Sequence, residues 1–253
     1  MKVRIDKLLV DKGIVPSRER AQALILAGKV LVDGQRIEKP GTPVPADSDI
    51  RMLGDDLRYV SRGGLKLEAA LQYWGIDLRD KTCLDIGAST GGFTDCLLQH
   101  GAKKVIAVDT GYGQIDFKLR KDARVRLLEK TNARYLEAED LGEAVDLIVM
   151  DVSFISSTLV LPAVVDAARS LGARPSIVVL VKPQFEVGRE QVGKGGIVRD
   201  PQAHSAAVVK VKDALRLLNF SVKEPIESPI LGTEGNREFL LYAQPANDNA
   251  VKS

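Results

Sequence analysis

The chain has 253 residues, of which 45% are hydrophobic and 28% are charged, and its formal net charge at pH 7 is +2. This composition is typical of a globular protein, and the length allows a full α/β domain together with a smaller one. The longest apolar runs, such as 176–181, are too short to cross a bilayer, and no apolar segment of a secretion signal follows Lys2 and Arg4. We therefore expect a cytoplasmic protein.

The first 39 residues carry the excess of positive charge, because nine lysines and arginines there stand against five acids, a net of +4. Two short helices are predicted in this segment. One ends at Gly13, and the other extends from an N-cap at Ser17 to Gly28. Alternating valines then lead into Asp33-Gly34, which is typical of a hairpin turn. The segment therefore combines a helix pair and a hairpin with a basic surface.

The stretch RIDKLLVDKGIVPSRERAQALILAGKVLVDGQRI resembles the α-L RNA-binding domain of a small-subunit ribosomal protein and of pseudouridine synthases. We place this small α+β domain at 1–56, with a loop at 40–48 and a linker at 57–60. A packing domain with a solvated basic face is the alternative. The resemblance implies salt-dependent contacts to RNA phosphates from five side chains: Arg4, Lys7, Arg18, Arg20 and Lys29.

The run 84–94, LDIGASTGGFT, leads from an apolar strand through small residues into a helix. Glycines in such a turn let the backbone approach a ligand, and Asp109 ends the next apolar strand, where an acid often binds ribose hydroxyls. Gly87, Ser89 and Gly92 follow the G-x-G-x-x-G spacing, but a serine replaces its second glycine. The pattern predicts a nucleoside cofactor and favours S-adenosylmethionine (SAM) over a dinucleotide, with a plain α/β turn as the alternative.

Apolar strands alternate with helical patterns from residue 82 onward, which favours a mostly parallel sheet covered on both faces. Asp151 and Lys182 each follow one of these strands, and ligands of such sheets bind beyond the carboxyl ends of the strands. If the two strands are neighbours, both side chains enter one cleft. The predicted strands are 82–86, 104–108, 124–128, 145–150, 176–181, 219–224 and 238–243, and the clearest helices are 158–170 and 202–218.

Seven blocks in order extend the resemblance to almost the whole chain: YVSRGGLKL, LDIGASTGGFTDCLL, VDTGYGQ, EKTNAR, MDVSFIS, LVKPQFEVG and GNREFL. Together they resemble the TlyA family of ribosomal RNA 2′-O-methyltransferases, relatives of the FtsJ methyltransferases that carry the α-L domain in front. The resemblance implies a Rossmann-like α/β methyltransferase domain over 61–244, with a seven-stranded sheet, and a flexible tail at 245–253. Some relatives have tryptophan in the linker, where this chain has Tyr59.

The resemblance also implies a reaction and its residues. The Lys-Asp-Lys-Glu tetrad of the FtsJ-like enzymes carries over onto Lys66, Asp151, Lys182 and Glu238. Lys182 would orient a ribose hydroxyl and accept its proton in the neutral form, which burial and Lys66 favour and the two acids oppose. Two surface ion pairs are the alternative. The residues expected around SAM are Asp85, Gly87, Ala88, Ser89, Gly91, Gly92, Asp109, Asn132 and Asp151; Asp85 could instead cap the turn.

The expected partner is ribosomal RNA or a ribosomal subunit, with cytidine as the expected target, in the large subunit and in some relatives also in the small one. No membrane partner and no metal are expected, since the two histidines and two cysteines lack metal-ligand spacing. The rival hypotheses are a membrane-active cytolysin, because relatives have been labelled haemolysins, an RNA-binding module with an inactive methyltransferase fold, and a nicotinamide enzyme. The segment 183–200 is interpreted either as a mobile loop whose Phe185 stacks on a base or as an ordered crossover.

Overall fold

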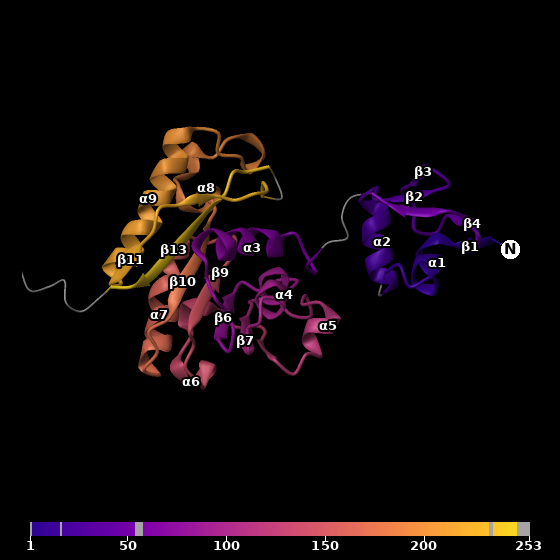
Figure 1. Ribbon diagram of the computed structural model, residues 1–253. Coiled ribbons are helices and arrows are strands. Elements are labelled where there is room, and N and C mark those ends of the chain that lie inside the picture. The colour runs from indigo at the N-terminus through magenta and orange to yellow at the C-terminus, as the bar shows by residue number, and fades with distance from the viewer. Residues whose placement is uncertain (1, 16, 54–57, 233–234, 247–253) are drawn as a thin grey trace, which may run out of the picture. The chain divides into compact units, whose positions relative to one another are not determined.

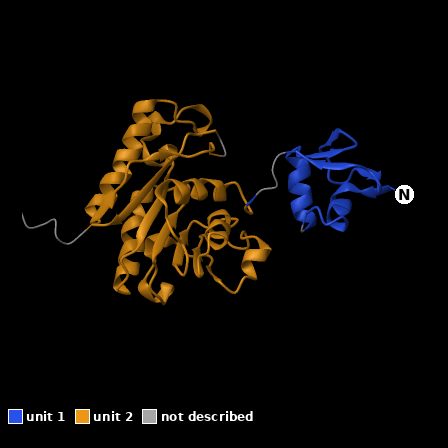
Figure 2. Ribbon diagram, in the orientation of Figure 1, with its two compact units in different colours: residues 1–58 blue, residues 59–253 orange. Residues whose placement is uncertain are grey.

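The computed structural model describes residues 2–15, 17–53, 58–232 and 235–246. The chain divides into two compact units, residues 1–58 and 59–253 (Figure 2). Residue 57 of the predicted linker 57–60, and residues 247–253 of the predicted tail 245–253, lie outside the described residues. Tyr59 is buried within the second unit, because its ring occupies the space that a side chain at Gly64 would need. The second unit thus begins two residues before the expected domain start.

The first unit packs two helices against short strands. Helix α1 (Ile5–Asp11) and α2 (Arg18–Leu26) bury their apolar faces, and Ser17 caps α2 by accepting a hydrogen bond from the Arg20 amide. The hairpin turn at Asp33-Gly34 has the positive φ angles, 51° and 79°, that its sequence predicts. The strands are β2 (Val30–Val32), β3 (Gln35–Ile37) and β5 (Ile50–Met52) in one antiparallel sheet, and β1 (Lys2–Arg4) paired with β4 (Pro43–Pro45).

The prediction of a plain loop at 40–48 is wrong in part, because β4 lies within it. A three-residue edge strand with a proline at each end carries no recognisable strand pattern, since proline cannot donate to a ladder. Strand β4 pairs with β1, the strand that directly precedes α1.

The second unit contains the predicted α/β sheet (Figure 1), in the order β11-β13-β10-β9-β6-β7-β8. Every pairing along this path is parallel except those of β13, which runs antiparallel to both neighbours. The seven-stranded fold class is confirmed, with one addition: β12 (Ile226–Glu227) also pairs with β13. The seven strands are β6 (Thr82–Ile86), β7 (Lys104–Val108), β8 (Val125–Leu128), β9 (Leu147–Met150), β10 (Ser176–Val181), β11 (Phe220–Val222) and β13 (Phe239–Pro245).

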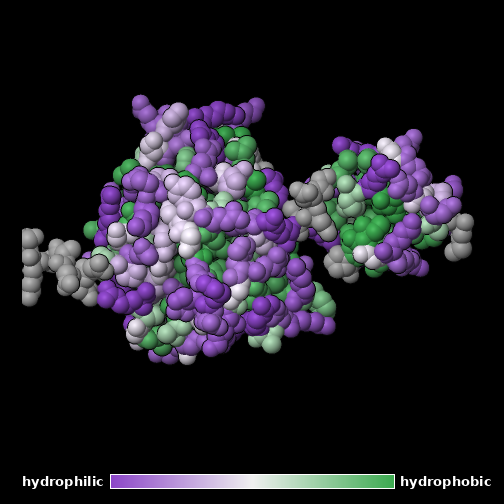
Figure 3. Space-filling view, viewed as in Figure 1, coloured by the Kyte–Doolittle hydropathy of each residue, from purple (hydrophilic) through white to green (hydrophobic). Residues whose placement is uncertain are grey.

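Alternate residues of these strands enter two separate cores, because successive side chains of a strand point to opposite faces. Helices α6 (Ala138–Leu141), α7 (Leu161–Ser170) and α9 (Pro201–Leu217) cover one face. Helices α3 (Gly63–Trp74) and α4 (Gly92–Gln99), with the short α5 (Phe117–Arg120), cover the other. Hydrophilic side chains are spread over the visible face of this unit in Figure 3. Helices on both faces thus hold the sheet, including the edge formed by the carboxyl ends of its parallel strands.

The segment 183–200, for which the sequence offered a mobile loop or an ordered crossover, connects β10 to α9 through short helical elements. It consists of α8 (Pro183–Glu186) and two 3-10 turns, η3 (Arg189–Gln191) and η4 (Lys194–Gly196). Asn236 holds its end, since its side chain donates to the Gly196 carbonyl at 2.8 Å and accepts from the Val198 amide at 2.9 Å. Two further 3-10 turns are η1 (Ala133–Tyr135) and η2 (Ser157–Leu159).

Candidate active site

The glycine-rich turn after β6 lies against the segment that follows β9. Gly87 has φ +85°, and a Cβ atom there would lie 2.5 Å from the carbonyl oxygen of Asp151. Both the backbone angle and the close approach therefore require glycine at this position. Ser89 also has a positive φ, 50°, and its amide donates to Asp109 at 2.8 Å. The turn is thus held between the ends of β7 and β9.

Asp109 organises the ends of two strands. One of its carboxylate oxygens accepts from the Ser89 amide, and the other accepts from the Gly111 amide at 2.6 Å. Each carboxylate oxygen retains acceptor capacity after one such bond. The acid predicted to bind ribose hydroxyls therefore has a fixed orientation and free lone pairs.

A pocket of about 440 Å³ opens between the turn and the loops after β7, β8 and β9. Five of the residues predicted for the cofactor are in its wall, namely Gly87, Ser89, Asp109, Asn132 and Asp151. The other four, Asp85, Ala88, Gly91 and Gly92, are outside the lining of this pocket. Position 91 packs against Leu119, and position 92 packs against Ser61 and Gly64, so these two glycines bring α4 close to α3 and α5.

Asp85 lies fully buried beneath the turn. One oxygen of its carboxyl accepts from the Thr94 hydroxyl at 2.6 Å, while the other, Oδ1, has no hydrogen-bond partner among the described residues. Burial raises the pKa of Asp85 to about 7; the Thr94 hydrogen bond opposes this shift and the charge of Asp151 adds to it. A buried acceptor without a partner is rare in folded proteins.

The four residues of the predicted tetrad form two ion pairs. Lys66 on α3 donates to Glu238 at 2.5 Å, and their side chains are 10% and 3% exposed. Lys182 Nζ lies 2.6 Å from Asp151 Oδ1 and donates to the Ser153 hydroxyl at 2.7 Å. The Lys182–Asp151 contact has the distance of an ion pair without the angles of a hydrogen bond, so we treat it as an ion pair. The Lys66–Glu238 pair is buried, unlike an ordinary surface ion pair, whereas the Lys182–Asp151 pair is partly exposed.

The sheet brings these pairs to one edge. Strands β10 and β13 are antiparallel, with Val181 opposite Phe239. Lys182, just after β10, and Glu238, just before β13, therefore lie at the same end of the sheet. Asp151 follows β9, the parallel neighbour of β10. The structure thus brings together all four predicted catalytic residues beside the pocket, although it leaves their roles as predictions.

Sequence reasoning missed an aromatic residue at the mouth of the pocket. Phe154 is 92% exposed, has a φ of +65°, and lines the pocket. Its ring lies 5.4 Å from that of Phe185, the residue predicted to stack on a base. A positive φ for a bulky residue is uncommon and marks a constrained loop. An exposed ring held in this way is suited to contact a planar ligand.

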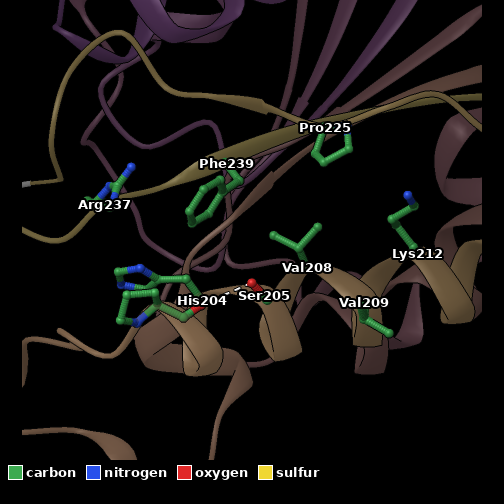
Figure 4. Close-up of a pocket in the computed structure, with 9 residues that line it drawn as sticks. His204, Ser205, Val208, Val209, Lys212, Pro225, Arg237 and Phe239 are labelled. Atoms are coloured by element: carbon green, nitrogen blue, oxygen red, sulfur yellow. Dashed lines mark hydrogen bonds between the residues drawn. The ribbon is translucent and has the colours of Figure 1, made fainter.

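A second pocket, of about 380 Å³, lies between α9 and β13 (Figure 4). His204, Val208 and Phe239 form its wall, and Arg237 at its rim pairs with Glu227. Because strand neighbours point to opposite faces, Phe239 faces α9 while Glu238 faces Lys66. This pocket therefore opens on the face of the sheet opposite to the Lys66–Glu238 pair.

The basic residues predicted to bind RNA all lie in the first unit. Two of them, Arg4 and Arg18, donate to the buried carboxylate of Asp6 at 2.9 to 3.0 Å, and their side chains remain half exposed. Lys7 is exposed, and Arg20 and Lys29 are partly exposed. Asp6, which the sequence alone did not single out, thus fixes part of the predicted RNA-binding surface.

The described residues contain no group of three or more histidine, cysteine or acidic side chains that could hold a metal ion. Cys83 and Cys96 are buried free thiols. Both histidines have structural partners, since His100 contacts the Cys96 carbonyl and His204 contacts the Val198 carbonyl. Across the described part of the chain, no helix has the length and apolar character needed to span a membrane.

Comparisons with known proteins agree with this geometry. Residues 59–244 match the model of the FtsJ-like methyltransferases, and residues 3–50 match that of the S4 domain. The chain is 48% identical to YqxC of Bacillus subtilis, a protein named as an rRNA methyltransferase. The match covers 95% of this chain and 85% of that protein. It is 45% identical to the 16S/23S rRNA (cytidine-2′-O)-methyltransferase TlyA of Mycobacterium tuberculosis, over 100% of this chain and 93% of that one.

A solved structure of a Streptococcus thermophilus protein described as a hemolysin superposes with a TM-score of 0.75. It is 44% identical to this chain and covers 99% of it, with 92% of the S. thermophilus chain covered. The two names, methyltransferase and hemolysin, are thus both found among close relatives. The family model spans the second unit from residue 59 to residue 244, one residue before the end of β13, and includes the pocket and both ion pairs. This chain therefore belongs to the family of FtsJ-like methyltransferases and carries an S4 domain in front.

Proposed function

We propose that this protein uses SAM to methylate the 2′-hydroxyl of a cytidine ribose in ribosomal RNA. The observation that carries the proposal is the arrangement of two lysine–carboxylate pairs at the sheet edge, one buried and one partly buried, next to the pocket that Asp109 and Asn132 line. The TlyA relative that matches the full length of the chain is named for this reaction in both 16S and 23S rRNA. We extend that activity to this chain as a hypothesis.

The residues around the pocket suit SAM. Asp109 offers free carboxylate lone pairs for ribose hydroxyls, and Asn132 lies in the wall where the adenine is expected. Asp85 Oδ1 provides an acceptor without a partner beneath the turn, where the methionine part with its ammonium group is expected. Gly87 keeps the turn open at the point where a side chain would collide. SAM, when bound, supplies a methyl group on a positively charged sulfur.

Lys182 is the residue we assign to the reacting hydroxyl. It is fixed at two points, by Asp151 and by the Ser153 hydroxyl, so its amine is held in one place at the pocket edge. In this mechanism Lys182, after its ammonium group has released a proton to solvent, would accept the proton of the ribose hydroxyl and so make its oxygen a better nucleophile toward the methyl group that SAM would supply. Asp151 then stabilises the ammonium group that forms. Correct placement of the hydroxyl contributes as much as its activation, because the attack must be in line.

Lys66 and Glu238 form the second pair, and we assign them to holding the ribose. Glu238 is almost completely buried, and a side chain at Gly232 would collide with it at 2.5 Å. A buried acid and a buried lysine in contact have little freedom to move, since breaking the pair would leave a charge unpaired. The pair thus offers one donor and one acceptor at fixed positions.

The first unit would bind the RNA through its basic surface. Arg4, Lys7, Arg18, Arg20 and Lys29 carry the charge that phosphates attract, and such contacts weaken as salt is added. Phe154 and Phe185 offer rings on which the target base can stack. Since the proposed substrate is ribosomal RNA or a ribosomal subunit, we propose the cytoplasm as the site of action.

The test is methyl transfer from labelled SAM to ribosomal subunits that lack the modification, followed by mapping of 2′-O-methyl groups. We expect one or a few labelled cytidines with the parent protein. We expect at least a thousandfold slower transfer with Lys182→Ala, because general base catalysis and positioning are lost together. Lys223→Ala, at an exposed lysine outside the site, is the matched control and should retain full activity.

Three outcomes would contradict the proposal in different ways. Absence of transfer to every RNA tested would refute the enzyme and favour a binding module. Full activity of Lys182→Ala would leave the reaction in place and remove the mechanism. Lysis of cells by the parent protein, without methyl transfer, would support the cytolysin that the hemolysin name suggests.

A further inference from the structure

The segments that carry Asp151 and Lys182 touch each other at three successive points. We call residues 151–157 the β9 loop; it faces residues 182–186, which comprise Lys182 and α8. The first contact is the hydrogen bond that Lys182 Nζ donates to Ser153 Oγ at 2.7 Å. The second is between the rings of Phe154 and Phe185, whose centroids lie 5.4 Å apart. The third contact is made by Glu186. The β9 loop is therefore attached to α8 along its whole length.

Glu186 makes the strongest of these contacts. Its side chain is 2% exposed, and both carboxylate oxygens act as acceptors. Oε1 accepts from the amide and from the hydroxyl of Ser157, both at 2.7 Å. Oε2 accepts from the Ser156 hydroxyl at 2.5 Å and lies 3.3 Å from Lys210 Nζ. Four partners from two other segments thus surround one buried acid.

These partners make the contact costly to break. A buried carboxylate that loses its hydrogen bonds retains the cost of its desolvation, so the fully bonded arrangement is strongly preferred. Lys210 also donates to the Glu186 carbonyl at 2.7 Å, which anchors the same residue to α9. The far end of the β9 loop is therefore fixed to two helices, while its near end holds Asp151 and Ser153.

Glu186 is absent from the lining of the pocket, so its effect on a reaction there must be indirect. Two structural links connect Glu186 to the site. Glu186 ends the helix that begins after Lys182, and its side chain fixes the end of the loop that begins at Asp151. A shift of the β9 loop would move Asp151 and Ser153, the two groups that hold Lys182. It would also move Phe154, which already has a constrained backbone.

We propose that Glu186 is a positioning residue for the reacting centre, which sets the place of Lys182 and Phe154 by attaching the β9 loop to α8. The proposal rests on the proposed function, since it concerns the rate of that same reaction. It predicts that loss of the Glu186 contacts lowers kcat, leaves SAM affinity intact, and loosens the β9 loop.

Glu186→Gln is the sharpest substitution because it keeps the size of the side chain. Both oxygens of the carboxylate accept from donors, whereas a carboxamide offers only one acceptor. One side of the contact is therefore lost whichever way the amide turns. We expect kcat with saturating SAM and RNA to fall about tenfold to a hundredfold, the range expected when catalytic groups are displaced by up to about 1 Å.

The readouts separate positioning from loss of folded protein. Calorimetric titration with SAM counts the binding-competent molecules, and we expect one site per chain with a Kd within twofold of the parent. Hydrogen exchange measured by mass spectrometry should be faster in a peptide covering 151–158, where the Ser157 amide donates to Glu186, and unchanged over 84–95. Exchange does not depend on activity, so it tests the attachment of the loop even if no substrate RNA is found.

Two controls limit the interpretation. Lys210→Met removes the ion pair and keeps the serine contacts, so kcat should stay within threefold of the parent. Glu190→Gln changes an exposed acid on the same segment and should have no effect. If Lys210→Met lowers kcat as much as Glu186→Gln, the charge pair with α9 is responsible and the positioning role is refuted.

Coupling to the reacting lysine is tested by a double substitution. If Glu186 acts through the β9 loop on Lys182, Glu186→Gln should lower kcat less in a Ser153→Ala background than in the parent, because one of the two contacts between the loop and the lysine is then already lost. Strictly multiplicative effects would refute this route. If Glu186→Gln fails to bind SAM stoichiometrically, Ser157→Ala replaces it: it removes one donor and keeps the amide, and an unchanged kcat would overturn the proposal.

A failure of this inference differs from a failure of the proposed function. A parent protein without methyl transfer to any RNA refutes the function. A parent protein that transfers methyl groups, with Glu186→Gln at the same kcat or with unchanged exchange over 151–158, refutes only the positioning role.

Discussion

Each unit contains a completely buried aspartate, and the two aspartates differ in the hydrogen-bond donors around them. In the first unit, hydrogen bonds from Arg4, then from Arg18 and Gln22, hold the pKa of Asp6 well below its usual range. In the second unit, burial raises the pKa of Asp85 from 3.8 to about 7. The hydrogen bond from Thr94 opposes this shift without cancelling it, and the charge of Asp151 adds to it. Burial alone therefore does not decide the charge of an acid; the donors around it do.

The difference follows the task of each unit. Asp6 is a permanent anion that arranges arginines on the surface where RNA is expected. The pKa of Asp85 is raised by burial to about 7, beneath a turn where a cationic ligand group is expected, so ligand binding and ionisation can reinforce each other. Four experiments can break or sharpen this contrast, and we give them in order of expected effect.

The largest effect is expected for Asp85→Asn as a function of pH. Between the unfolded value of 3.8 and about 7 the folded protein binds one proton more than the unfolded chain, so the stability contributed by this group falls as pH rises through that window. The free energy of unfolding of the variant relative to the parent should rise by roughly 3 kcal/mol from pH 5 to pH 8. Urea unfolding at the two pH values measures this change, and a constant difference would contradict it.

The second largest effect is expected for Asp6→Asn, which should lower the free energy of unfolding of the first unit by roughly 2 kcal/mol. The loss is smaller than for a fully buried ion pair because both arginines are half exposed. The sign of its pH dependence is opposite. Since the folded pKa of Asp6 is lowered, its contribution is present above about pH 4 and is lost as pH falls further. Hydrogen exchange of amides in α1 and α2 reports on this unit, and SAM affinity should not change.

Thr94→Val tests the hydrogen bond to Asp85 directly. A hydrogen bond to an ionised acceptor contributes more than one to a neutral acceptor, so the loss of stability should be roughly 1 kcal/mol larger at pH 8 than at pH 5. Urea unfolding of parent and variant provides the comparison. Equal losses at both pH values would mean that Asp85 has one charge state throughout.

The smallest effect on stability is expected for Lys7→Ala, an exposed residue outside the Asp6 cluster, with a change below about 0.5 kcal/mol. RNA affinity should nevertheless weaken, and the slope of log affinity against log salt should decrease by about 1 if one phosphate contact is lost. Filter binding over a salt series measures both. Arg18→Ala should change stability and RNA binding together, because Asp6 links them.

Much of the fold was predictable because apolar runs mark buried strands. The predicted strands 82–86, 104–108 and 176–181 agree with β6, β7 and β10, since their ends coincide with the limits of burial. The two-residue strand β12 and the proline-flanked β4 were not predictable, because such short strands have no periodicity. Their existence depends on a neighbouring strand, which the local sequence does not contain.

The candidate site shows the same division. Asp151 and Lys182 could be placed from their positions after strands, whereas Lys66 was placed by family resemblance alone and its pairing with Glu238 was not predicted. Asp6 and Glu186 were missed for a physical reason: a buried acid satisfied by distant donors has the same local sequence as a surface acid. Only tertiary contacts distinguish the two, and no pattern of neighbouring residues records them.

The Lys66–Glu238 contact joins residues that are 172 positions apart in the chain. At a synthesis rate of about 5 to 20 residues per second, the lysine emerges from the ribosome roughly 10 to 30 s before its acid exists. During that interval α3 cannot bury the ammonium group beside its partner, so its docking must wait for the last strand. A nascent or prematurely terminated chain therefore lacks the buried Lys66–Glu238 pair, so the proposed reacting centre is completed only at the end of biosynthesis.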